Sequence, residues 1–227
     1  MSKIVHPYAY RLGVLRDWRH RWFAVAPKYQ EYLKADILLR EFLQRELRPM
    51  HLGGIELERG EKTLRVIVKT SRPGLIIGRS GEGSVKLKNK ITSFLASKKL
   101  EVPEVKLDIE EIRSPESNAA IVAYMVAEAM EKRMPFRRVL KQTIEKVIAN
   151  RDVKGVRIAV SGMLGSGSMS RKEELKKGRI PLQTLRSDID YARERANLPL
   201  GVIGIKVWIY KGEVFAEKAS GKDKKDK

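Results

Sequence analysis

The chain has 227 residues, of which 47 are Lys or Arg and 28 are Asp or Glu, so its formal net charge is +19. A compact fold normally carries a much smaller charge because like charges repel, and this excess favours a polyanionic partner. The absence of cysteine excludes disulfides, thiolate zinc sites and cysteine nucleophiles. Since the sequence shows no signal-peptide pattern and no run of about eighteen apolar residues, we expect nucleic acid rather than a membrane as the partner, and a cytoplasmic location.

Residues 1–26 are poorly periodic and rich in arginine and aromatic side chains, among them Tyr8, Tyr10, Trp18 and Trp22. We expect an N-terminal arm. Its aromatic residues could pack against a domain, or they could contact nucleic-acid bases and phosphates together with the neighbouring arginines. The residues of the arm do not favour one alternative over the other.

A helix is predicted to begin after Pro27, because Leu33, Ile37, Leu38 and Phe42 recur at helical spacing. Two strands are predicted next, at 55–59 and 63–69, since the second alternates apolar and polar residues. Helical spacing likewise predicts a second helix over 85–96, and alternation predicts a third strand over 104–110. Residues 27–112 therefore read as one α+β domain with the order helix, strand, strand, helix, loop, helix, strand.

The loop of this domain is Gly78-Arg79-Ser80-Gly81. Gly-x-x-Gly by itself is typical of an ordinary tight turn. Here it follows the apolar pair Ile76-Ile77 and joins two helices flanked by strands, and its glycines let a phosphate approach without a clash from a Cβ. This is the arrangement of a type II KH domain, whose loop clamps the backbone of a single nucleic-acid strand.

The second half, 113–212, is predicted to be two helices on a small sheet. Ser114 and Pro115 are typical of a helix start, and Pro135 separates the first helix from a second one over 136–149. Strands are predicted at 155–160 and 202–210. The charged segments 170–178 and 187–195 are ambiguous, but the position of 187–195 between strands favours an edge strand. Residues 213–227 are expected to be a disordered charged tail.

A cationic cluster lies at the start of the 136–149 helix. Arg137, Arg138 and Lys141 occupy neighbouring positions on one helix face, with Arg133 just before them. Positive charge at a helix N-terminus opposes the helix dipole, so a solvated surface is the less favoured interpretation. We expect a patch that contacts the RNA backbone.

Other motifs in the sequence argue against a catalytic or metal-binding function. The glycine-rich run 162–168 lacks the Gly-Lys-Ser/Thr that a phosphate-binding P-loop requires and is expected to be a hairpin turn. Asp188 and Asp190 could suggest magnesium, but Arg186 and Arg193 flank them, so surface ion pairs are favoured. No nucleophile, base and orienting group stand together, and the three histidines are scattered. We therefore expect no enzyme activity, no metal site and no cofactor.

Blocks along nearly the whole chain resemble one family, the KH-containing small-subunit ribosomal proteins of the S-three family in their bacterial form. The most specific blocks are the last two, 178–191, which begins with Gly178-Arg179-Ile180-Pro181, and 201–213. Chance agreement over so many blocks in order is not credible. The matching blocks are 6–13, 18–23, 72–81, 133–138, 178–191 and 201–213.

The resemblance implies an α+β protein with an N-terminal type II KH domain and a C-terminal two-helix, four-strand domain. It implies a structural place in the head of the small subunit, bound to ribosomal RNA and to proteins of the S-ten and S-fourteen families. It also implies that the basic helix lines the messenger RNA entrance and assists unwinding of structured messages. The candidate RNA-binding residues are Arg11, Gly78, Arg79, Ser80, Gly81, Arg133, Arg137, Arg138, Lys141, Arg171 and Arg179.

The Gly-x-x-Gly loop departs from the family in one respect. The family often carries two cations between the glycines, whereas this chain has Arg79 and Ser80, followed by Glu82. We therefore expect the loop to identify the domain and the cluster at Arg137, Arg138 and Lys141 to contribute more to RNA binding. The alternatives are a free KH-type regulator of messenger RNA, and a nuclease or lyase acting on nucleic acid.

Overall fold

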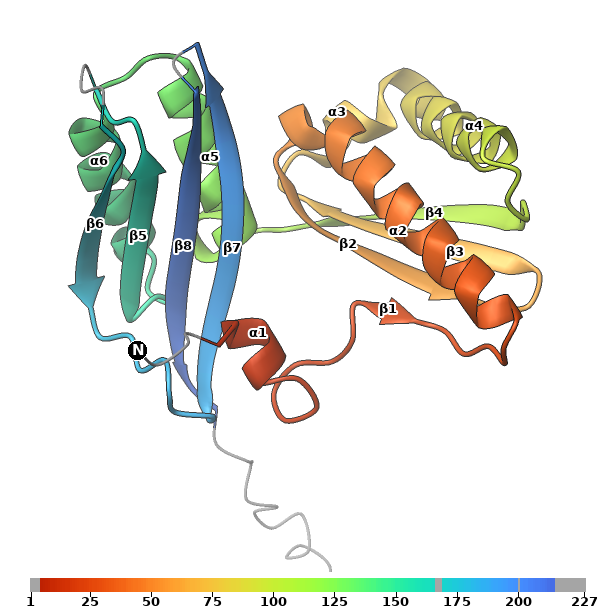
Figure 1. The fold of residues 1–227 in the computed structure, drawn as a ribbon, viewed down its shortest axis with the longest axis horizontal. Coiled ribbons are helices and arrows are strands. Elements are labelled where there is room, and N and C mark those ends of the chain that lie inside the picture. Colours follow the sequence, from red (N-terminus) through yellow and green to blue (C-terminus); the bar gives the residue numbers. More distant parts are fainter. Residues whose placement is uncertain (1–4, 166–168, 200, 215–227) are drawn as a thin grey trace, which may run out of the picture.

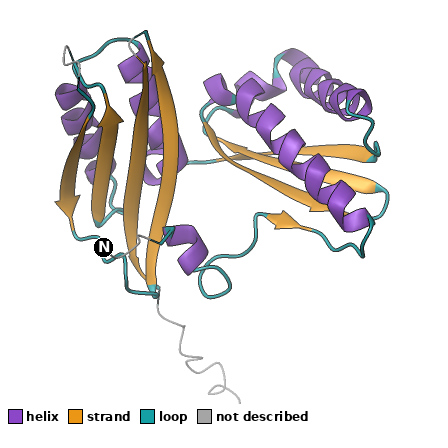
Figure 2. Ribbon diagram, in the orientation of Figure 1, coloured by secondary structure: helices purple, strands orange, loops and turns teal. Residues whose placement is uncertain are grey.

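The computed structural model describes residues 5–165, 169–199 and 201–214 of the chain. It contains two four-stranded sheets, each with helices packed on one face, as Figure 1 and Figure 2 show. Each sheet has its own apolar core. The chain is therefore α+β, as predicted.

The N-terminal sheet has the strand order β1-β2-β3-β4. Strands β2 and β3 are antiparallel, whereas β3 and β4 are parallel because the connecting helices return the chain to the same end. The predicted order of helix, strand, strand, helix, loop, helix, strand is confirmed. Its elements are α2 (Lys28–Glu46), β2 (Leu52–Arg59), β3 (Thr63–Thr70), α3 (Pro73–Ile77), α4 (Glu82–Ser97) and β4 (Glu104–Glu111), with short 3-10 turns at Arg48–Met50 and Arg79–Gly81.

The predicted apolar stripe of α2 was partly wrong. Leu33 and Ile37 are 40% and 42% exposed. Apolar residues occur on more than one side of this helix, and only the position of the sheet decides which side is covered. The buried residues of α2 are Tyr32, Ala35, Asp36, Leu39 and Leu43.

The N-terminal arm joins the two halves of the molecule. Its first part forms α1 (Pro7–Tyr10), which packs on the C-terminal sheet. Its second part forms β1 (His20–Arg21), which extends the N-terminal sheet by pairing in parallel with β2. Trp22 packs against Tyr29, with ring centroids 5.2 Å apart. Trp18 remains 64% exposed, so the arm packs through some of its aromatic residues and not through others.

The C-terminal sheet has the order β6-β5-β8-β7, with every neighbouring pair antiparallel. Both helices lie on one face, and the segment predicted to be an edge strand is the edge strand β7. The predicted two-helix, four-strand arrangement is thus confirmed. Its elements are α5 (Ala119–Glu131), α6 (Phe136–Ala149), β5 (Gly155–Gly162), β6 (Arg171–Gly178), β7 (Ser187–Leu198) and β8 (Gly201–Glu213).

Several boundaries differ from the predictions: β2 begins at Leu52 rather than residue 55, for example, and β7 continues to Leu198. Ser114 does not cap α5: Pro115–Ser117 form a separate 3-10 turn, and the Asn118 side chain accepts hydrogen bonds from the amides of Ala120 and Ile121. Asn118 is as good a cap as serine, and the turn ahead of it was not visible in the pattern. Strand β8 continues through Glu213, and the rest of the predicted tail, from residue 215, lies outside the described residues, as do residues 166–168 of the predicted hairpin turn.

Candidate nucleic-acid interface

The Gly-x-x-Gly loop lies between α3 and α4 at the exposed end of the N-terminal helices. Gly78 and Gly81 have φ angles of +69° and +81°, in the region that favours glycine. Ser80 also has a positive φ of 51°, so the loop turns sharply at three of its four residues. The loop is thus the compact connection between helices that the KH prediction required.

Gly83 lies just after the loop and was not among the residues predicted from the sequence to matter. A Cβ at this position would lie 2.4 Å from the carbonyl oxygen of Ile76 and 2.9 Å from that of Ile77. The first turn of α4 therefore packs directly against the end of α3. The sequence shows a third glycine two residues after the motif. Its neighbours in the sequence do not indicate that the backbone of α3 approaches it closely.

Gly83→Ala should lower the free energy of unfolding by about 1 to 3 kcal/mol, because the added methyl group has no room beside two carbonyl oxygens. Thermal or urea unfolding measures the change. Gly74→Ala is the matched control: it lies in α3 with no atom within 4 Å of its Cβ position, and alanine there should be neutral or mildly stabilising. Equal stability of the two variants would contradict the close approach.

The loop carries little free positive charge. Arg79 is exposed, and its side chain has no ion pair among the described residues. Glu82 is held by Lys86 at 3.3 Å, in an exposed pair. The carboxylate beside the loop is thus partly neutralised, and a single cation remains to meet a phosphate.

The second cluster lies where α6 begins. Arg137, Arg138 and Lys141 are all exposed on its first two turns, and Arg133 lies in the turn before it with a positive φ of 61°. Of the three helix residues, Arg137 has an ion-pair partner among the described residues, Glu173 of β6, at 3.4 Å. Arg138 and Lys141 are left to solvent.

The structure brings Arg171 to this cluster. Arg171 begins β6, its guanidinium lies 5.6 Å from the ring centroid of Phe136 at the start of α6, and it approaches Glu173 at 3.5 Å. Arg179 is not part of the cluster. Arg179 follows the other end of β6. That end lies about 24 Å from Arg171, because a strand rises about 3.4 Å per residue.

Arg11 was wrongly placed in the RNA-binding set. Arg11 is 0% exposed to solvent. Its guanidinium donates hydrogen bonds to four backbone carbonyls, those of Ser187 at 2.6 Å, Leu182 at 2.9 Å, Thr184 at 2.9 Å and Pro7 at 3.0 Å. Burial lowers the pKa of Arg11 from its ordinary value. This buried arginine, with four hydrogen bonds to backbone carbonyls, ties the arm to the C-terminal sheet and is not exposed on the surface where RNA would bind. Its spacing in an arginine-rich arm gave no sign of this, because three of the four acceptors lie more than 170 residues away in the chain.

Asp188 and Asp190 have structural partners. Asp188 pairs with Arg16 of the arm at 2.6 Å. Asp190 accepts a hydrogen bond from the amide of Ala119 at the start of α5. Within the described part of the chain, no group of three His, Asp or Glu side chains is placed to hold a metal ion. No helix of that part is long and apolar enough to cross a membrane.

The strand and helix order, with its glycine loop, defines a KH-type nucleic-acid-binding protein that carries a second α+β unit. The family model of the KH domain matches residues 38–117, and that described as "Ribosomal protein S3, C-terminal domain" matches residues 126–209. The chain belongs to the ribosomal protein S3 family, as its sequence blocks predicted.

Relatives of this family match almost the whole chain. The proteins named "Small ribosomal subunit protein uS3" of Caldicellulosiruptor bescii and Caldicellulosiruptor saccharolyticus are each 40% identical over 224 residues, which is 99% of this chain and 98% of theirs. The protein of that name in Pseudomonas aeruginosa is 42% identical over 215 residues, 95% of this chain and 91% of its own.

Proposed function

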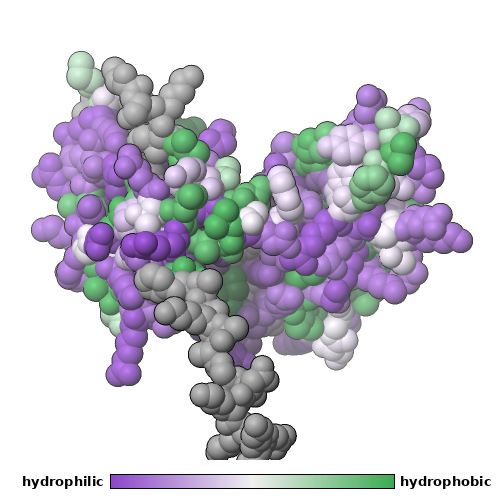
Figure 3. Space-filling view, turned by 90° about the horizontal axis from the view of Figure 1, so that it is seen from below, coloured by the Kyte–Doolittle hydropathy of each residue, from purple (hydrophilic) through white to green (hydrophobic). Residues whose placement is uncertain are grey.

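We propose that this protein is a structural constituent of the small ribosomal subunit, in its head, and that it binds ribosomal RNA without catalysing a reaction. The names of its relatives and a net charge of +19 support this. Hydrophilic residues cover much of the face drawn in Figure 3. We also propose that it works in the cytoplasm, on the ribosome, as a KH domain at 27–112 and a second domain at 113–212.

The finer proposal is that the start of α6 lines the messenger RNA entrance and assists unwinding of structured messages. The observation that carries it is the first two turns of α6, where Arg137, Arg138 and Lys141 are exposed and no acidic residue is present. Cations there work against the helix dipole. A phosphate backbone moving past these turns would compensate for that cost.

Neighbouring proteins of the S-ten and S-fourteen families are proposed as partners. Apolar side chains of the arm and of the outer side of α2 support protein contacts, because they are large, exposed and close in the chain. They are Phe23 at 89%, Val25 at 72%, Tyr29 at 48%, Ile37 at 42% and Leu33 at 40% exposure.

The proposed association with the small subunit is tested by sedimentation: the protein should travel with small subunits, and a protein left at the top of the gradient would contradict it.

The double reversal Arg137→Glu with Arg138→Glu tests the entrance proposal. It should still assemble, because acids suit a helix N-terminus. Translation of a hairpin-containing message, relative to an unstructured one, should fall about fivefold, the factor that corresponds to about 1 kcal/mol. The matched control, Lys146→Glu with Arg151→Glu, changes the same charge at the other end of α6. Equal translation of both messages by the first variant would contradict the proposal.

A further inference from the structure

The C-terminal sheet has one face without helices. Side chains such as Val156, Ile158 and Val207 form the face that packs on α5 and α6, and both helices lie behind the sheet in Figure 1. The opposite face turns toward the reader in that view. At one end of this open face, the segment around Ile180 and Leu182 packs on the sheet. At the other end most of the charged side chains of β6, β7 and β8 are exposed, whereas Ala159 and Trp208 are buried.

Strand register places the side chains of this end at three levels across the sheet. Each level takes one residue from each strand, in the order β6, β5, β8, β7. The levels are Lys172, Ser161, Gly204 and Arg195, then Glu174, Ala159, Lys206 and Arg193, then Lys176, Arg157, Trp208 and Tyr191. We call the cations of these levels the cationic sheet face: Arg157, Lys172, Lys176, Arg193, Arg195 and Lys206.

Most of this charge is not neutralised within the protein. Glu174 is the acid at these levels, and it pairs with Arg157 at 2.7 Å and with Lys172 at 3.0 Å. These hydrogen bonds lower the pKa of Glu174. The side chains of the other four cations make no ion pair within the described part of the chain.

Two of those four cations are direct cross-strand neighbours. Arg193 of the edge strand β7 lies opposite Lys206 of β8. Like charges directly opposite each other destabilise a sheet. A stable protein that keeps this pair, with no acid beside it at that edge, is suited to a ligand that brings negative charge.

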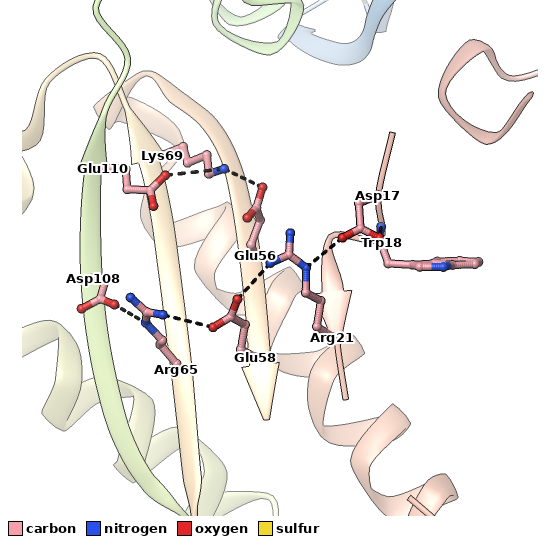
Figure 4. Close-up of polar contacts among 9 residues, drawn as sticks. All are labelled: Asp17, Trp18, Arg21, Glu56, Glu58, Arg65, Lys69, Asp108 and Glu110. Atoms are coloured by element: carbon pink, nitrogen blue, oxygen red, sulfur yellow. Dashed lines mark hydrogen bonds and ion pairs between the residues drawn. The ribbon is translucent and has the colours of Figure 1, made fainter. Parts of the chain in front are cut away.

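The open face of the N-terminal sheet provides a comparison within the same molecule. There Arg65 and Lys69 are matched by acids, as Figure 4 shows, whereas Lys106, which lies opposite Arg65, has no ion pair among the described residues. Arg65 pairs with Glu58 at 3.2 Å and also with Asp108, and Lys69 pairs with Glu56 at 2.7 Å and with Glu110 at 3.5 Å. Two sheets of the same chain thus expose opposite balances of charge, so the net charge of +19 is not spread evenly.

The first of these levels is low in its middle. Ser161 and Gly204 occupy paired positions on the two central strands, and their side chains are small or absent. Lys172 of β6 and Arg195 of β7 stand on either side of them. A backbone could therefore approach the sheet at this level while the two long cations reach it from the sides.

We propose that the cationic sheet face binds the sugar-phosphate backbone of base-paired RNA. This site rests on the proposed function in that it requires the chain to bind RNA, and it is separate from the start of α6, which lies on the opposite face of the same sheet. The C-terminal domain would then bind RNA electrostatically through two surfaces, the start of α6 and the cationic sheet face.

The choice of paired RNA follows from the aromatic residues. Single strands are held mainly by stacking bases on exposed rings. Trp208 is 6% exposed, and the guanidinium of Arg157 covers its ring at 4.9 Å from the centroid. Tyr191 is partly buried and packs edge-on against His6. Because no open ring is presented at these levels, contacts to phosphates and 2′-hydroxyls of a helix fit better.

The test is binding of the full chain to a fluorescent RNA hairpin with a long paired stem, measured over a range of salt concentrations. The variant combines Arg193→Gln, Arg195→Gln and Lys206→Gln. Its dissociation constant should rise on the order of tenfold or more, and the slope of log K against log salt should fall by about 2 to 3. Arg193→Lys with Arg195→Lys and Lys206→Arg keeps the charge and should restore most of the binding.

The matched control combines Arg65→Gln, Lys69→Gln and Lys106→Gln, which removes the same charge from the open face of the N-terminal sheet. It should leave affinity and salt slope nearly unchanged. Circular dichroism of every variant shows that the fold is retained. A polyglutamate peptide at equal charge concentration tests whether an acidic protein is the ligand instead.

The outcomes are distinct. Weak binding by the test variant alone supports the site. An equal loss in test and control variants, no loss in either, or displacement of the RNA by polyglutamate would overturn it while leaving RNA binding intact. Failure of the wild-type chain to bind any RNA would instead overturn the proposed function.

Discussion

Arg11→Ala should lower the free energy of unfolding by about 3 to 5 kcal/mol, the largest effect that we expect from a single arginine outside the N-terminal core. The guanidinium of Arg11 donates to carbonyls of Pro7, Leu182, Thr184 and Ser187. Its removal leaves several of these acceptors without a donor in a buried place. Urea unfolding followed by circular dichroism measures the change.

Two further variants separate this structural role from a general effect of charge. Arg11→Lys keeps the charge but cannot reach four carbonyls with one ammonium group, so it should recover only part of the loss. Arg16→Ala removes a neighbouring arginine that pairs with Asp188 and is 32% exposed, and it should cost about 1 kcal/mol or less. An Arg11→Ala variant of unchanged stability but weakened RNA binding would restore the original assignment of Arg11 as an RNA contact.

Asp36→Ala should lower the free energy of unfolding by about 3 to 5 kcal/mol. Asp36 of α2 pairs with Arg59 of β2 at 2.9 Å, and their side chains are 6% and 3% exposed. The Arg59 guanidinium also lies 4.5 Å from the ring centroid of Tyr32. Without the carboxylate, a charged group would remain buried and unpaired where α2 meets the sheet. Thermal unfolding measures the change.

A double substitution tests whether the lost pairing is the cause. Asp36→Leu with Arg59→Met removes both charges and keeps apolar volume, so it should recover most of the stability lost by Asp36→Ala. A double-mutant cycle gives the coupling energy of the two side chains. The exposed pair of Glu82 and Lys86, whose side chains are 69% and 74% exposed, serves as the control, and Glu82→Ala should change stability little. A coupling energy near zero for Asp36 and Arg59 would contradict the prediction.

Local pattern in the sequence was enough for the types and order of the elements. The alternation in β3 and the helical spacing in α4 and α6 are properties of consecutive residues, and the glycine loop, with its neighbours, identified the KH domain. The cluster at Arg137, Arg138 and Lys141 was also visible, because residues one and four apart on a helix are neighbours wherever the helix lies. The family followed from blocks that extend along the whole chain.

Other features depend on residues that are distant in the sequence. Leu33 and Ile37 continue the helical period of α2, yet the sheet covers the side that holds Leu39 and Leu43. Gly83 has meaning only because α3 returns to it, and Arg179 is separated from Arg171 by the length of a strand.

The sequence by itself therefore determined the α+β class, the KH domain with its Gly-x-x-Gly loop, the basic start of α6 and the family. Only the tertiary structure decided that Arg11 is a buried clamp and that Arg193 and Lys206 stand side by side on an open sheet face. The physical reason is the range of the interactions. Periodicity and helix-face neighbours are set within a few residues, whereas burial and cross-strand pairing are set by which distant segment comes to lie alongside.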